Sequence, residues 1–140
     1  GVAAGLWISR DVVERERWKL TVENDAFARE AALRIPKGSL VIASWDGANL
    51  EYHAPGVEIA ALTPGGTTPA AETAGRGAAD VASSVDAALA SGRRVYVTFR
   101  FLEEPPDPAV DAARRDLDRR FERTPAGDGL YRLVPRDPGR

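Results

Sequence analysis

The chain has 140 residues, the length of one domain with one hydrophobic core. Its 19 Lys and Arg against 21 Asp and Glu give a net charge of -2, which argues against nucleic-acid binding, where a basic excess is usual. The absence of Cys excludes disulfides and Cys-based zinc sites, and the lone His53 excludes a multi-histidine metal site. We therefore expect no metal and no cofactor, and no nucleic-acid partner.

The chain begins with eight residues that are all apolar or glycine, GVAAGLWI. Eight helical residues span about 12 Å, far less than a bilayer. Residues 1–10 have two interpretations, the end of a membrane helix or simply the start of the chain. Because the first residue is Gly and the chain has no Met, we expect it to be a piece of a longer polypeptide or a processed chain.

A helix is predicted over residues 11–34, which lack Pro and Gly and are rich in helix formers. Asn24 or Asp25 is a candidate cap for a second helix after a break. Pro36-Lys37-Gly38 predicts a turn. The four apolar residues that follow, 40–43, predict a strand buried on both faces.

The middle of the chain alternates between short regular segments and a Gly-rich stretch. Residues 48–53 predict at least one helical turn, and residues 57–62 predict a second strand. Residues 63–77 contain mainly Gly, Thr, Pro and Ala with no large apolar side chain, so we expect a flexible surface loop. A helix is predicted over residues 78–91, with Gly92 at the position of a C-terminal cap.

The last third predicts a strand, a helix and a hairpin. Apolar and polar residues alternate over 94–101, which is typical of a strand. Asp107 followed by Pro108 predicts a capped helix start. Phe121 to Thr124 and Leu130 to Val134 predict the arms of a hairpin, with Asp128-Gly129 as the best local turn signal. Residues 136–140 predict a tail.

This order of strands and helices predicts the fold class. Strands alternating with helices imply right-handed crossovers and parallel pairing. We expect a single α/β domain over residues 11–135, with a small three-layer Rossmann-like fold. Its sheet is predicted to be mostly parallel, with a C-terminal antiparallel hairpin.

Candidate ligand-binding residues follow the first predicted strand. Ser44, Trp45 and Asp46 come just after residue 43, and the carboxyl edge of an open α/β sheet is where ligands bind. Tyr52 in the next segment and Thr98 in a later strand are further candidates. We identify no catalytic residue.

Each of these candidates also has a structural interpretation. Asp46 suits the cap of the following helix, and phosphotransfer or metal binding would need a second carboxylate that Gly47-Ala48 does not supply. Trp45 would either pack against a neighbouring helix or stack on a sugar. Ser44 lacks the G-x-S-x-G surroundings of a hydrolase nucleophile, and we interpret His53 as a surface residue.

Five short motifs occur in order along residues 24–134. They are Leu33-Arg34-Ile35-Pro36-Lys37-Gly38-Ser39, Ser44-Trp45-Asp46, Leu50 with Tyr52, Gly92-Arg93-Arg94 before Val95-Tyr96-Val97-Thr98, and Gly129-Leu130-Tyr131-Arg132-Leu133. This series resembles the soluble C-terminal region of bacterial GT-C type membrane glycosyltransferases, similar to the protein O-mannosyltransferase-like family. An Arg-Pro-Asp-Val type segment that the family often has after its second strand is missing here.

The resemblance implies an extracytoplasmic, non-catalytic domain at the cell membrane. Such enzymes transfer a sugar from a polyprenyl-phosphate carrier, and their catalytic acids lie in the membrane part. The expected partners are the membrane-embedded part of the same polypeptide and a sugar or glycan acceptor. The alternative is a free-standing Rossmann-like module that binds a ligand or a protein without catalysis.

Overall fold

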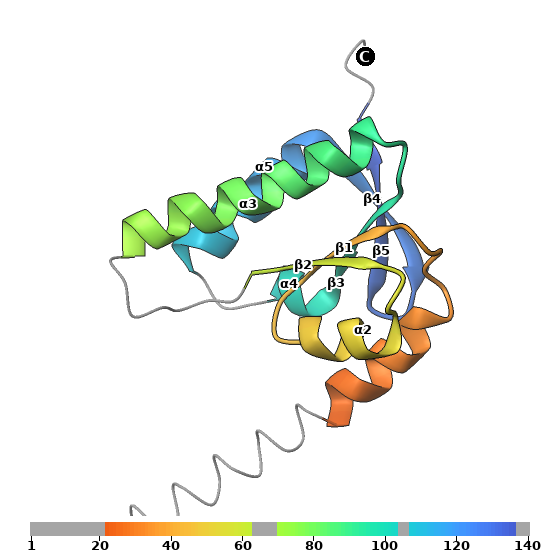
Figure 1. Ribbon diagram of the computed structural model, residues 1–140. Helices are drawn as coiled ribbons and strands as arrows, with labels where there is room; N and C mark the ends of the chain where they lie inside the picture. The colour runs from red at the N-terminus through yellow and green to blue at the C-terminus, as the bar shows by residue number, and fades with distance from the viewer. Residues whose placement is uncertain (1–21, 63–69, 104–106, 137–140) are drawn as a thin grey trace, which may run out of the picture.

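A computed structural model describes residues 22–62, 70–103 and 107–136 (Figure 1). The predictions for residues 1–10, for the first half of the helix over 11–34, for the first seven residues of the loop over 63–77 and for most of the tail fall outside these ranges. Within them the chain forms one five-stranded sheet with helices on both faces.

The sheet has the strand order β2-β1-β3-β5-β4. β1 (Leu40–Ala43) is the central parallel strand, with β2 (Glu58–Ala61) on one side and β3 (Val95–Thr98) on the other. β4 (Phe121–Gly127) and β5 (Leu130–Pro135) form the predicted antiparallel hairpin, and β5 pairs antiparallel with β3.

The prediction of a mostly parallel sheet is wrong, because two of the four strand pairings are antiparallel. β4 follows a helix, as β2 and β3 do, and it runs in the same direction as β3. The tight turn at Asp128-Gly129 then reverses the chain and places β5 between β3 and β4. As a result β5 pairs antiparallel with both of these strands. Gly129 suits this turn because its φ is +76°, in the left-handed region.

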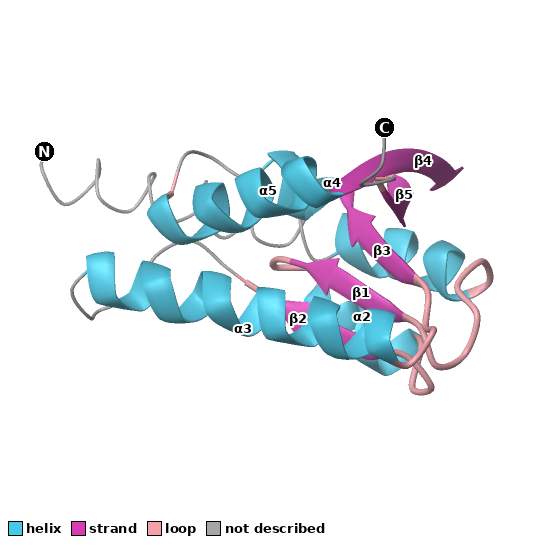
Figure 2. Cartoon of the chain, turned by 90° about the horizontal axis from the view of Figure 1, so that it is seen from above, coloured by secondary structure: helices cyan, strands magenta, loops and turns pink. Residues whose placement is uncertain are grey.

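Two long helices cover one face of the sheet, α3 (Ala70–Ala90) and α5 (Pro108–Arg120) (Figure 1, Figure 2). Strand side chains alternate between faces, and Leu40 and Ile42 are directed to this side. The other members of this core come from α3, β3, α4, α5 and the hairpin: Val81, Val85, Ala88, Val95, Val97, Phe101, Val110, Ala113, Leu117, Phe121 and Leu133.

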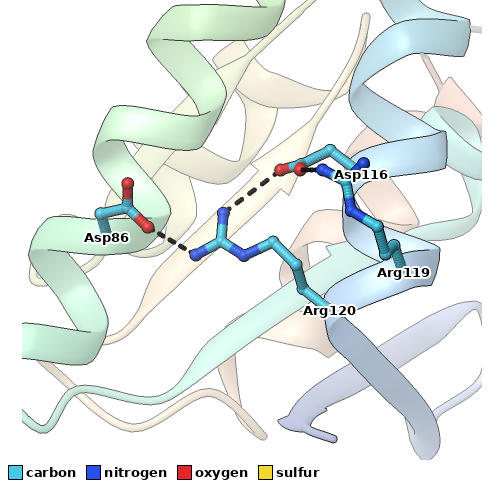
Figure 3. Close-up of polar contacts among 4 residues, drawn as sticks. All are labelled: Asp86, Asp116, Arg119 and Arg120. Atoms are coloured by element: carbon cyan, nitrogen blue, oxygen red, sulfur yellow. Dashed lines mark hydrogen bonds and ion pairs between the residues drawn. The ribbon is translucent and has the colours of Figure 1, made fainter. Parts of the chain in front are cut away.

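An ion-pair network joins α3 to α5 at the edge of this core (Figure 3). The Arg120 guanidinium donates to Asp86 of α3 at 2.5 Å and to Asp116 of its own helix at 3.2 Å. Arg119 also donates to Asp116, at 2.5 Å. Arg120 therefore bridges the two helices, whereas Arg119 acts within α5.

The opposite face is covered by α2 (Gly47–His53) and by the helix over residues 22–32, orange in Figure 1. Its core has fewer buried residues, three of which are alanines: Ala28, Ala31, Ile35, Val41, Ala43, Leu50, Tyr96 and Leu130. Gly47 permits the close approach of α2 to the sheet, because a Cβ there would lie 2.9 Å from the Ala61 Cβ.

Two predicted helix caps are confirmed. The Asp107 side chain accepts hydrogen bonds from the backbone N–H groups of Ala109 and Val110, at 3.0 and 3.2 Å, at the start of α5. Gly92 ends α3 with a φ of +70°. Its N–H donates to Leu89, and the Arg93 N–H donates to Ala88, which is the Schellman pattern.

Three local predictions need correction. α3 begins at Ala70, so residues 70–77 of the predicted loop are helical, in keeping with their many alanines. The strand predicted over 94–101 ends at Thr98, and α4 (Phe99–Glu103) follows it. The helix over residues 22–32 also runs through Asn24 and Asp25 without the break that a second cap requires.

Candidate functional site

The turn between β1 and α2 lies where the strand order reverses. From β1 the chain moves to β2 on one side of it, and then crosses over to β3 on the other. In doubly wound sheets the crevice at such a reversal is the usual ligand site. Ser44, Trp45 and Asp46 form this turn, and Thr98 ends the neighbouring strand β3.

Asp46 is fully buried and folds back on its own turn. Its Oδ1 accepts a hydrogen bond from the Ser44 N–H at 3.0 Å. Asp46 occupies the N-cap position of α2, but its side chain makes no capping hydrogen bond. The interpretation of this carboxylate as a helix cap is therefore wrong.

The second carboxylate oxygen of Asp46, Oδ2, has no hydrogen-bond partner among the described residues. Burial raises the pKa of this carboxyl above its ordinary value, because it disfavours the charged form. The Ser44 N–H and the Thr98 hydroxyl act in the opposite direction but do not reverse the shift. The interior thus favours the protonated form of Asp46.

Three of the five predicted ligand-binding residues lie together. Ser44, Asp46 and Thr98 are all buried, and the Thr98 hydroxyl accepts a long hydrogen bond of 3.5 Å from the Phe101 N–H. These three residues are not open to a ligand in this conformation. They form a polar interior corner between β1, β3 and α4.

The other two candidates, Trp45 and Tyr52, lie on the surface. Trp45 is 59% exposed and Tyr52 is 81% exposed. This exposure of Trp45 argues against the interpretation that it packs against a neighbouring helix. The Tyr52 ring meets the His53 ring edge-to-face, with centroids 5.1 Å apart.

His53 and Asp25 connect α2 to the helix over residues 22–32, a contact that the interpretation of His53 as a surface residue did not include. His53 Nε2 lies 2.7 Å from Asp25 Oδ1. The hydrogen bond with His53 lowers the pKa of the Asp25 carboxyl, and the positive charge of Arg29 adds to the effect.

Arg100 connects α4 to the same helix. Its guanidinium donates to Asn24 Oδ1 and to Glu23 Oε2, both at 2.9 Å. Its Cζ lies 4.9 Å from the centroid of the Phe99 ring. The positive charge of Arg100 also reaches Asp46, where it favours the ionised form.

A cleft of about 650 Å³ opens beside Arg100. It lies between the helix over residues 22–32, α4 and the turn of the hairpin. Its lining combines aromatic side chains with four carboxylates. The sequence predictions missed this cleft because its walls come from segments about 70 to 100 positions apart, and no motif joins them.

The described residues show neither a metal-binding group nor a membrane span. Nowhere in the ranges that the structure covers do three His, Asp or Glu side chains come together as metal ligands. No helix in those ranges is both long and apolar enough to cross a membrane.

Comparison with known proteins gives no relative. No protein-family model, no curated protein and no solved structure matches the chain. The function must therefore be argued from the site.

Proposed function

We propose that this chain is the extracytoplasmic, non-catalytic C-terminal domain of a membrane glycosyltransferase that uses a polyprenyl-phosphate-linked sugar. The observation that carries the proposal is the exposure of Trp45 in the turn at the carboxyl end of β1, together with the exposure of Tyr52 in the last turn of α2. Exposed aromatic rings suit the apolar faces of sugars. In this role the domain binds the acceptor or packs on the membrane-embedded part of the same polypeptide.

The other motif residues have structural roles. Gly92 closes α3, and Leu130 and Leu133 fill the two cores of the sheet. Asp46 is fully buried, so a sugar donor cannot reach its carboxylate in this conformation. The proposal therefore assigns the catalytic acids to the membrane part and binding to this domain.

The proposal is tested on the full-length protein in membranes supplied with a polyprenyl-phosphate-linked sugar. Trp45→Ala and Tyr52→Ala are expected to raise the KM for the acceptor and to leave kcat nearly unchanged. Leu33→Ala is the matched control, because Leu33 is 81% exposed and belongs to none of the candidate residues. An upstream gene sequence without membrane-spanning helices would contradict the proposal, and an unchanged KM in both aromatic variants would contradict the acceptor-binding role.

A second candidate is a free-standing Rossmann-like module that binds a ligand or another protein. The strand order β2-β1-β3 favours this candidate, because the direction in which strands are added to the sheet reverses between β1 and β3. Doubly wound sheets bind ligands in the crevice at such a reversal. A thermal-shift screen with nucleotides and sugars separates the two candidates. Stabilisation by a nucleotide, in a chain whose gene encodes no membrane spans, supports the second candidate, and a screen without any stabilising compound counts against it.

A further inference from the structure

The cleft beside α4 has an aromatic wall. Phe27 from the helix over residues 22–32 and Phe99 from α4 meet edge-to-face, with ring centroids 5.1 Å apart and an interplanar angle of 78°. Tyr131 of β5 adds a third aromatic ring to the lining. The volume of about 650 Å³ is within the range of small-molecule sites.

The charge of the lining is strongly negative. It contains the acids Glu23, Glu30, Glu103 and Asp128 and the single base Arg100, which gives four negative charges against one positive. Glu23 is paired with Arg100 and Glu30 with Arg34. Within the described ranges no ion pair engages Glu103 or Asp128. The cleft therefore has two carboxylates available to a visiting cation.

One organic cation of the protein itself already lies at this wall. The Arg100 guanidinium lies 4.9 Å from the centroid of the Phe99 ring and donates to the Glu23 carboxylate at 2.9 Å. A guanidinium over an aromatic ring gains from the negative face of the ring, and a carboxylate beside it adds a charge-assisted hydrogen bond. The lining contains a second set of such groups, the Tyr131 ring and the carboxylates of Glu103 and Asp128.

We propose that this cleft binds a second organic cation, an ammonium or guanidinium group carried on an apolar stem. The charged group pairs with Glu103 and Asp128, and the stem lies against the aromatic wall. A bare divalent cation fits less well, because the described acids do not gather into a group that could hold a metal ion. The proposal is independent of the membrane-enzyme proposal above, since it rests on the cleft alone.

The same chemistry has two sources, a free polyamine or a Lys or Arg side chain of a peptide. Both are tested by titrating the chain with spermidine and with Nα-acetyl-arginine amide while amide NMR shifts are recorded. Shifts are expected to concentrate at Phe27, Phe99 and Gly129 and to weaken as salt is added. Tighter binding of the capped arginine indicates a peptide source, and tighter binding of spermidine indicates a free polyamine.

Two charge-matched variants make the test specific. Glu103→Gln with Asp128→Asn removes the two available carboxylates and is expected to weaken binding by about tenfold. Asp118→Asn with Glu122→Gln removes two carboxylates at the other end of the hairpin, where Glu122 pairs with Val134, and is expected to leave binding unchanged. Because all four side chains are at least partly exposed, both variants should fold.

Three results would overturn the proposal. One is the absence of shifts with either cation at millimolar concentration. Another is an equal loss of affinity in both double variants, which would indicate non-specific attraction. The third is an equal response to Nα-acetyl-norleucine amide, which keeps the apolar stem and lacks the charge.

Discussion

The two faces of the sheet differ in what covers them. The face under α3 and α5 has the larger apolar core and is closed at its edge by the Arg120 network. The face under α2 and the helix over residues 22–32 has a core of fewer buried residues, three of them alanines. Polar contacts instead join its two helices to each other, through Asp25 and His53, and join the helix over residues 22–32 to Arg100 of α4, through Glu23 and Asn24.

This difference indicates a division of roles. The α3–α5 face supplies most of the apolar burial, which is the main stabilising contribution to folding. The other face carries the buried Asp46, the exposed Trp45 and Tyr52 and contributes a wall of the cleft. We therefore expect stability to be concentrated on the first face and recognition on the second.

The largest effect is expected from the same truncation made on each face. Phe101→Ala removes a fully buried ring from the α3–α5 core and should lower the free energy of unfolding by about 3–5 kcal/mol. Phe27→Ala removes a half-buried ring beside the cleft and should cost about 1–2 kcal/mol. Urea denaturation measures both. Equal losses would contradict the proposed division between the faces.

The next effect concerns two glycines with similar backbone conformations. Gly129→Ala forces a side chain into the left-handed region and places its Cβ 2.7 Å from Phe99, so we expect a cost of about 3 kcal/mol. Gly92→Ala has the same backbone strain with no atom within 4 Å of the new Cβ, so about 1–2 kcal/mol is expected. Thermal unfolding of both variants shows whether the contact at the cleft adds to the strain.

The pH dependence of stability distinguishes two carboxylates on the second face. The pKa of Asp46 is raised in the folded state. The contribution of this carboxyl to the free energy of unfolding is therefore fully present below its ordinary pKa of 3.8 and is lost as the pH rises through the raised value. Asp46→Asn should therefore become more stable relative to the wild type as the pH rises from 3.8 toward neutrality. Urea denaturation at a series of pH values tests this. A difference in the free energy of unfolding between variant and wild type that does not change with pH would contradict burial of the charge.

Asp25 should give the opposite trend. The pKa of Asp25 is lowered in the folded state, so its contribution to the free energy of unfolding is present above pH 3.8 and is lost as the pH falls through the lowered value. Asp25→Asn should thus be destabilised relative to the wild type at neutral pH, and the difference should shrink in acid. A matching loss in a His53→Gln variant would assign the effect to their contact.

The smallest effect is expected at the surface network in Figure 3. Arg120→Gln breaks the bridge between α3 and α5 and should cost about 1 kcal/mol, less at high salt. Arg119→Gln breaks a contact within α5 only and should cost at most about 0.5 kcal/mol. Urea denaturation at low and high salt compares them, and equal costs would show that the bridge adds nothing.

Some of the fold could be predicted from local signals. β1 was predicted at residues 40–43 because a short apolar run lies between two turns. Asp107 and Asp128-Gly129 were predicted as a cap and a turn because their chemistry acts on the nearest backbone groups. These signals depend on a few neighbouring residues, so the sequence alone contains them.

Other features depend on contacts between distant residues. The alternation of apolar and polar residues that predicts a strand over 94–101 continues past Thr98, although α4 begins there. α4 places Phe101 in the core under α3 and α5, and it places Phe99 against Phe27 on the opposite side of the sheet. The fold-back of the Asp46 carboxylate and the insertion of β5 beside β3 likewise require the assembled sheet. The structure brings Ser44, Asp46 and Thr98 together, but their burial was not predicted.

Native-state hydrogen exchange compares the two faces residue by residue, because it reports the free energy of opening for each amide. Amides of Val85 and Val97, which lie in the α3–α5 core, are expected to exchange only through global unfolding. Amides of Ala28 and Ala31 should exchange through local opening at a lower free energy. Equal protection of the two pairs would contradict the claim that stability is concentrated on the α3–α5 face.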